Sequence, residues 1–187
     1  MVIFLFKLIF RFNGWKVGNS IPSDIKRCIV IAAPHTSNWD FVYGIVAVNL
    51  LQIKVNYLAK KELFVWPIKR IFTKSGGIPV ERKNAQNVVE AMIKLFKERK
   101  QLILAIPTEG TRKGVAKWKS GFYRIALAAN VPVVLGYIDY KKKEVGFGPI
   151  IYLSGDKEKD AMKIREFYEG VQAKIPEYFN LDAIRFD

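Results

Sequence analysis

Short apolar runs rich in β-branched residues alternate along this chain with longer segments of helical periodicity, and no other feature limits its possible folds as strongly. The runs CIVIAA (28–33), LILAIP (102–107) and PVVLGYI (132–138) have the length and composition of buried strands. Further extended segments are expected at 55–59 and 145–153. Strands that alternate with helices predict an α/β fold, a single domain with a mainly parallel central sheet flanked by helices.

The clearest helical pattern comes just before LILAIP. Apolar residues recur there three or four positions apart between polar ones, which predicts an amphipathic helix over 84–100 with Asn84 as its N-cap. The segment GGIPVER (76–82) is predicted to be a turn that leads into a short extended piece. Pro67 is expected to start or kink a short helix. The remaining helices are expected over 38–51, 62–72, 120–130 and about 156–178.

The N-terminal segment MVIFLFKLIFRF is predicted to form a helix that lies on a membrane surface. As a helix of about 12 residues it is roughly 18 Å long, well short of the roughly 30 Å hydrocarbon core. Lys7 and Arg11 are four residues apart and share one face, which leaves a wide apolar surface elsewhere. We therefore expect residues 1–16 to be a membrane-associating helix, with Trp15 near its end also at the membrane surface. Residues 17–187 are expected to form the main domain. The alternative is that this helix packs on its own domain.

Composition restricts the class of partner. The chain has 187 residues, half of them apolar, which is enough for one core, and its net charge of +14 favours an anionic partner. Nucleic acid, a membrane surface and a phosphorylated ligand all meet that condition. The basic residues are scattered and form no stripe with an RNA-binding aromatic motif, so no nucleic-acid partner is expected. The single cysteine, Cys28, fits a reducing compartment and is predicted to be a small core residue.

The segment AAPHTSNWDF (32–41) contains the only histidine of the chain, His35, and a carboxylate at Asp40. A histidine in a turn after a strand is a candidate general base, and Asp40 is a candidate for orienting its imidazole. The alternative is structural, because Ser37 and Asp40 fit the capping-box pattern at the start of a helix. The two roles are compatible. Ser37 is disfavoured as a nucleophile because the chain lacks a Gly-x-Ser-x-Gly turn.

Two more loops carry phosphate-binding chemistry, and the first of them follows a strand. In TEGTRKG (108–114), glycine allows backbone amides to approach an anion, and Arg112 is suited to bind phosphate through two hydrogen bonds. The segment GGIPVERK (76–83) offers a second such set, and each loop alone is equally consistent with a solvated turn. Ligands of parallel sheets bind beyond the carboxyl ends of the strands, so we expect the loops at 35 and 109 to face one crevice. One histidine and one cysteine leave no recognisable metal site.

Taken together, these loops resemble the sequence blocks of the glycerolipid acyltransferase family, whose best known members are the 1-acylglycerol-3-phosphate acyltransferases. The family's His-x4-Asp block resembles the segment from His35 to Asp40, its Gly-rich block ending in Arg resembles GGIPVER, and its Pro-Glu-Gly-Thr-Arg block resembles PTEGTR. A fourth block resembles VPVVLG (131–136). The blocks occur in the family's order and cover roughly residues 28 to 140, so their combination is far more specific than any one of them.

The resemblance implies a division of roles. His35 is the implied base and Asp40 its partner, and an acyl thioester on coenzyme A or acyl carrier protein is the implied donor, with no bound cofactor or metal. Two departures fall on the acceptor side: Thr108 is inserted between proline and glutamate, and Pro79 stands where an aromatic or aliphatic residue is common. The implied substrate-binding residues are Gly77, Arg82, Glu109, Gly110, Thr111 and Arg112.

These features lead to one functional hypothesis and two alternatives. The hypothesis is an acyl-thioester-dependent O-acyltransferase of phospholipid biosynthesis, peripheral at the cytoplasmic face of the cell membrane. Its acceptor is a lysophosphatidate-like lipid (1-acyl-sn-glycerol-3-phosphate), and the acyl group moves by direct transfer through a tetrahedral intermediate. The first alternative keeps the chemistry but uses a non-phosphate acceptor, such as an amino-acid lipid. The second is a non-catalytic module that binds a membrane surface.

Overall fold

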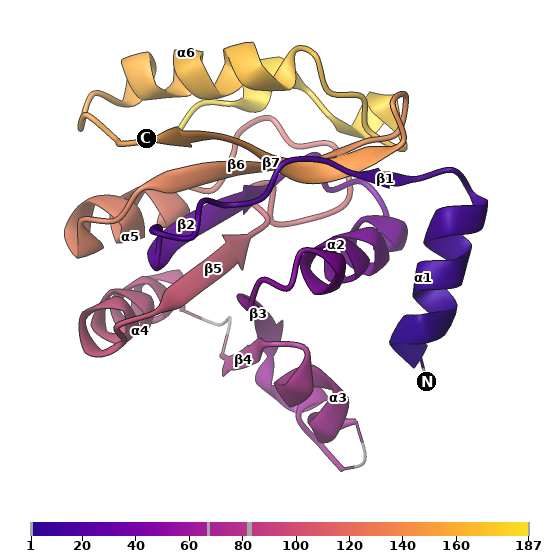
Figure 1. The fold of residues 1–187 in the computed structure, drawn as a ribbon. Coiled ribbons are helices and arrows are strands. Elements are labelled where there is room, and N and C mark those ends of the chain that lie inside the picture. The colour runs from indigo at the N-terminus through magenta and orange to yellow at the C-terminus, as the bar shows by residue number, and fades with distance from the viewer. Residues whose placement is uncertain (1, 67, 82–83, 187) are drawn as a thin grey trace.

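A twisted sheet runs through the molecule (Figure 1), with the strand order β1-β7-β6-β2-β5-β3-β4 in the part of the chain that the structure describes. The structure is a computed structural model and describes residues 2–66, 68–81 and 84–186. Only β6 and β7 pair antiparallel among these strands. The predicted α/β fold with a mainly parallel sheet is therefore confirmed. The strands are β1 (Lys16–Val17), β2 (Arg27–Ala32), β3 (Val55–Lys60), β4 (Gly77–Val80), β5 (Leu102–Ile106), β6 (Val133–Asp139) and β7 (Glu144–Ile151).

Helices cover both faces of the sheet. Side chains of α4, α5 and α6 pack on one face, and α2 packs on the other face with α1 beside it (Figure 1). Each strand supplies both layers because its side chains alternate in direction. In β2, Ile29 and Ile31 face the α4–α5–α6 side, whereas Cys28 and Val30 face α2. The helices are α1 (Val2–Phe12), α2 (Asn38–Leu50), α3 (Lys69–Lys74), α4 (Ala85–Glu98), α5 (Gly121–Ala129) and α6 (Lys157–Tyr168), with single 3₁₀ turns at Lys61–Leu63, Pro176–Tyr178 and Leu181–Ala183.

Local sequence signals account for several helix ends. Asn84 caps α4 by accepting hydrogen bonds from two main-chain N–H groups, as predicted, and α5 ends at Asn130 in the left-handed conformation. Burial raises the pKa of Cys28 to about 12, which fits its predicted place in the core. Pro67, the expected start or kink of the short helix, lies outside the described residues.

The segment after α1 departs from expectation. Trp15 is buried rather than placed on a membrane-facing surface, with its ring 4.3 Å from that of Tyr43 on α2. Lys16 and Val17 then form a short strand, β1, which pairs with β7 and which no sequence pattern predicts because it has only two residues. The aromatic contacts and the strand pairing together fix the end of α1 against the domain.

The last predicted helix is shorter than expected. It ends at Tyr168 rather than near Tyr178, and the chain then turns back toward the sheet. The main-chain N–H of Tyr140, just beyond β6, donates to the carbonyl of Gln172 at 2.9 Å. The segment after α6 is therefore held at the carboxyl end of β6. Within the described residues, every helix is too short or too polar to cross a membrane.

Candidate functional site

The candidate site forms where three neighbouring parallel strands end. In sheet order these are β6, β2 and β5, and their carboxyl ends lead to Tyr140, to the loop that contains His35, and to the loop that contains Glu109. The two loops that were expected to share a crevice therefore lie on adjacent strands. The carboxyl ends of the strands are where parallel α/β sheets bind their ligands.

His35 and Asp40 lie close together, and Asp40 also completes the helix cap. Its Oδ2 atom accepts hydrogen bonds from the main-chain N–H groups of Thr36 and Ser37, both at 2.7 Å, and lies 3.6 Å from Nδ1 of His35. The Ser37 hydroxyl accepts the N–H of Trp39 at 3.2 Å, so the capping box is complete. The catalytic and structural interpretations of Asp40 thus describe the same geometry.

A residue that the sequence did not reveal completes the surroundings of Asp40. The Tyr140 hydroxyl donates to Oδ1 of Asp40 at 2.7 Å across a separation of 100 residues. Asp40 itself is only 4% exposed, so all three hydrogen bonds are made to a buried carboxylate. The one signal for Tyr140 in the sequence is its place at the end of a predicted strand, which does not say which side chain it meets.

Glu109 joins the two loops from inside the protein. Its Oε2 atom accepts the main-chain N–H of His35 at 2.8 Å, and the residue is 3% exposed. Burial raises the pKa of this carboxyl to about 8, the His35 hydrogen bond opposes the rise, and the charge of Asp40 adds to it. Through this hydrogen bond the buried Glu109 side chain holds the loop that carries His35. The inserted Thr108 is fully buried too, and its carbonyl accepts the N–H of Lys119 at 2.7 Å.

The surroundings of His35 favour a neutral imidazole. Burial lowers its pKa, the Asp40 carboxylate raises it, and the Arg112 guanidinium lowers it. The side chain remains 17% exposed, so it is accessible from solvent. A neutral imidazole whose Nδ1 faces a carboxylate is the arrangement that a general base requires.

The other predicted site residues do not all lie near His35 and Asp40. Gly110, Thr111 and Arg112 are exposed on the loop after β5, where Gly110 has a φ of +70° that favours glycine. Gly77 begins β4, which β5 and β3 separate from β2, so the strand order does not bring it to the dyad. Arg82 lies outside the described residues. Among the residues that the structure describes, no three His, Cys, Asp or Glu side chains gather in a way that would hold a metal ion.

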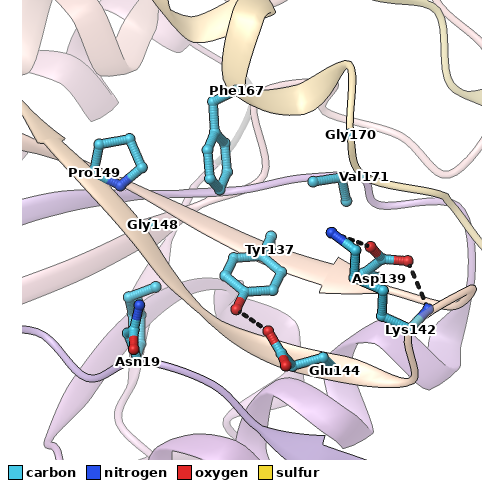
Figure 2. A pocket seen from close by; sticks show the side chains of 11 residues that line it. Asn19, Tyr137, Asp139, Lys142, Glu144, Gly148, Pro149, Phe167, Gly170 and Val171 are labelled. Carbon is cyan, nitrogen blue, oxygen red and sulfur yellow. Dashed lines mark hydrogen bonds and ion pairs between the residues drawn. The ribbon is translucent and has the colours of Figure 1, made fainter.

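A separate hollow of about 460 Å³ lies between β6, β7 and the end of α6 (Figure 2). Its polar groups are paired with one another: the Tyr137 hydroxyl donates to Glu144, and Lys142 lies 3.6 Å from Asp139. None of the predicted site residues lines it. This hollow is therefore distinct from the candidate site.

Comparison with known proteins gives concordant results. The family model described as Acyltransferase matches residues 16–137. The chain is 30% identical to the 1-acyl-sn-glycerol-3-phosphate acyltransferase of Salmonella typhimurium (strain LT2) and 29% identical to that of Escherichia coli (strain K12), each over 130 residues. These alignments cover 65% of this chain and 51% of each relative, so the chain spans about half the length of the curated relatives it matches.

A solved structure shares the fold. The crystal structure of the 1-acyl-sn-glycerophosphate (LPA) acyltransferase PlsC from Thermotoga maritima superposes with a TM-score of 0.60, covering 91% of this chain and 78% of that protein. The two sequences are 20% identical, so this likeness concerns the fold alone. The family model matches more than half of the chain and includes the strands that support His35, Asp40 and the loop after β5. The chain therefore belongs to the acyltransferase family.

Proposed function

We propose that this chain is an acyl-thioester-dependent O-acyltransferase of phospholipid biosynthesis, with a lysophosphatidate-like lipid (1-acyl-sn-glycerol-3-phosphate) as acceptor. The observation that carries the proposal is the position of Nδ1 of His35, 3.6 Å from the buried carboxylate of Asp40, at the carboxyl ends of the central strands. Family membership supports the reaction class. The names of the similar bacterial proteins support the choice of acceptor.

The proposed reaction uses the imidazole as a proton carrier. With Nδ1 facing Asp40, Nε2 of His35 takes the proton of the acceptor hydroxyl while the hydroxyl oxygen attacks the thioester carbonyl carbon. The Asp40 carboxylate stabilises the imidazolium that forms. When the tetrahedral intermediate collapses, the carbon–sulfur bond breaks and the imidazolium returns its proton to the departing thiolate. The products are an ester and a free thiol, and the base is regenerated.

The acceptor side of the proposal rests on the exposed loop after β5. The Arg112 guanidinium lowers the pKa of the His35 imidazole, which supports a role for Arg112 in binding the acceptor phosphate in the neighbourhood of the base. Gly110 and Thr111 present main-chain and hydroxyl groups on the same loop. Glu109 holds this loop against His35 from the interior. Gly77, which the resemblance assigns to the acceptor, is proposed to contact parts of the substrate farther from the dyad.

Replacing Arg112 with alanine is expected to raise the KM for a phosphate-bearing acceptor by roughly tenfold, because a hydrogen bond to a charged group contributes about 1.5–3 kcal/mol. The KM for the acyl thioester should stay within about twofold in the same assay. Arg99→Ala is the matched control, since Arg99 is exposed and precedes the amino-terminal end of β5, opposite to the end that leads to Arg112. A change confined to the donor KM contradicts the role of Arg112.

The proposed function is tested by release of free thiol from palmitoyl-coenzyme A or palmitoyl-acyl carrier protein in detergent micelles. Each donor is combined with lysophosphatidate, with monoacylglycerol, or with a lyso-form of an amino-acid lipid. Thiol release that requires lysophosphatidate supports the proposal. Thiol release that occurs only with a non-phosphate acceptor supports the same chemistry with a different acceptor. No acceptor-dependent release with either donor overturns the enzymatic proposal in favour of a membrane-surface binding module.

We propose further that residues 1–16 attach the domain 17–187 peripherally to the cytoplasmic face of the cell membrane. On α1, Phe4, Leu5 and Phe12 are 65%, 56% and 85% exposed, although Phe10 on the same helix is buried against α2. The exposed side chains form an apolar surface beside Arg11, which is the pattern of an interfacial helix. The net charge of +14 adds attraction to anionic lipid.

The double variant Leu5→Asp with Phe12→Asp is expected to weaken binding to phosphatidylglycerol vesicles by at least tenfold, because each apolar side chain contributes about 1.5–3 kcal/mol when buried. Co-flotation with the vesicles measures this. The double variant Met162→Asp with Tyr152→Asp is the matched control, because it adds the same charge at two similarly exposed residues away from α1. Equal losses in both variants, or none in the first, speak against α1 as the attachment surface.

A further inference from the structure

We propose that Tyr140 is a positioning residue of the catalytic dyad, whose hydroxyl fixes the Asp40 carboxylate in the orientation that presents Oδ2 to His35. This inference rests on the proposed function, because it assigns Tyr140 a part in the same acyl transfer. It adds a residue from the end of β6 to a dyad that otherwise comes entirely from the loop after β2 and the first turn of α2.

The hydrogen bonds around Asp40 divide between its two oxygen atoms. Two main-chain N–H groups donate to Oδ2, and the Tyr140 hydroxyl donates to Oδ1. Together they determine the plane of a carboxylate that is almost completely buried. A buried carboxylate oxygen that loses its donor is strongly destabilised, so it turns toward another donor or takes a proton. Either response weakens the attraction between Asp40 and the imidazole of His35.

Tyr140 is itself held from several directions. Its ring packs edge-on against Trp15 at 4.9 Å, and Nζ of Lys174 lies 5.3 Å from the ring centre. The preceding Asp139 (Figure 2) accepts the main-chain N–H groups of Lys141 and Lys142 at 2.9 and 3.1 Å, which fixes the turn after β6. Burial, together with the hydrogen bond to Asp40, raises the pKa of the Tyr140 phenol well above its usual value. The hydroxyl therefore remains a donor throughout the pH range of the reaction.

A tyrosine three residues earlier, on β6, provides a matched control. The Tyr137 hydroxyl also donates to a carboxylate, that of Glu144, in the separate hollow described above (Figure 2). Tyr137 and Tyr140 thus share the residue type, the neighbourhood in the chain and the kind of hydrogen bond. They differ in whether the carboxylate belongs to the dyad. Tyrosine-to-phenylalanine substitutions remove one hydroxyl in each case and keep the ring packing.

The kinetic experiment compares Tyr140→Phe with Tyr137→Phe. We expect Tyr140→Phe to lower kcat about tenfold and to leave both KM values within about twofold, because the lost interaction acts on the base and not on substrate binding. Tyr137→Phe should keep kcat within about twofold of the wild type. A wild-type kcat in Tyr140→Phe, or an equal loss in both variants, overturns the positioning role.

A second measurement does not depend on turnover. His35 is the only histidine, so one imidazole resonance followed by NMR across a pH titration gives its pKa directly. Asp40 raises this pKa, so weakening the contact in Tyr140→Phe should lower it, whereas Tyr137→Phe should leave it unchanged. The other charged groups nearby, Glu109, Arg112 and Lys174, are the same in all variants. An unchanged or raised His35 pKa in folded Tyr140→Phe overturns the inference.

The Asp40→Asn background shows whether Tyr140 acts through Asp40. Once the carboxylate charge is removed, adding Tyr140→Phe should not lower the His35 pKa further, and a further decrease overturns the inference. Thermal unfolding of each variant confirms that the compared proteins are folded. Wild-type protein that transfers no acyl group contradicts the proposed function, while the NMR titration still decides the contact between Tyr140 and the dyad.

Discussion

Replacing His35 with alanine is expected to lower kcat by roughly 10²- to 10⁴-fold, the range attributed to general acid–base catalysis. The imidazole is the proposed acceptor of the hydroxyl proton, and the Asp40 carboxylate beside it cannot replace it, because Oδ2 already accepts two main-chain hydrogen bonds. Thiol release with saturating lysophosphatidate and palmitoyl-coenzyme A measures the loss. The KM values should change much less than kcat.

The fold of this variant should remain close to the wild type. The structural bond that His35 makes to Glu109 uses its main-chain N–H group, which alanine retains. The melting temperature is therefore expected to shift by only a few degrees, in line with a change of about 1 kcal/mol. Full activity in His35→Ala excludes the general-base mechanism. Lost activity with lost structure requires His35→Gln as a second variant, which keeps a polar side chain but cannot act as the base.

Replacing Glu109 with glutamine is expected to stabilise the protein increasingly as the pH rises. In the folded wild type the pKa of Glu109 is about 8, whereas an unfolded glutamate has its ordinary value near 4.5. Between these values the folded state holds a proton that the unfolded state has lost, so the free energy of unfolding falls as the pH rises. The contribution is fully present below the lower value and is lost above the upper one, and it totals about 5 kcal/mol.

Glutamine removes this proton equilibrium and keeps an oxygen that accepts the His35 N–H. Urea unfolding at pH 5, 6, 7 and 8 measures the free energy of unfolding of both proteins. The value for the variant minus that for the wild type should increase at each step. The difference between proteins is the useful quantity, because the lowered pKa of His35 acts in the opposite sense and weakens both proteins as the pH falls. Glu166→Gln, an exposed position on α6, is the control. Parallel pH dependences of wild type and Glu109→Gln contradict the raised pKa.

Much of the fold follows from local patterns in the sequence. The runs at 28–33, 102–107 and 132–138 became adjacent central strands, because β-branched apolar residues suit a sheet that is covered on both faces. Features fixed by distant contacts were not predictable in this way. Burial of Trp15 depends on aromatic residues of α2 and on Tyr140, and the end of α6 depends on a segment that packs at β6.

The candidate site shows the same division. The pairing of His35 with Asp40 follows from the capping pattern, because a turn of helix determines where the side chain at the third helical position lies. The position of Glu109 does not, since an acidic residue in a glycine-containing loop ordinarily lies in solvent, whereas here it is buried beneath His35. The contact of Tyr140 with Asp40 is likewise set by the order of strands in the sheet, which periodicity does not reveal.

The pairing of β1 with β7 affects the N-terminal segment while the chain is being synthesised on the ribosome. Lys16 and Val17 find their partners only after Glu144 and Val145 have been synthesised, and at roughly 5 to 20 residues per second that interval lasts roughly 6 to 26 seconds. Throughout it the apolar α1 lacks the strand pairing that anchors its end. During translation α1 can contact α2 but lacks the strand pairing, so a nearby bilayer or a chaperone is expected to compete for its apolar side chains.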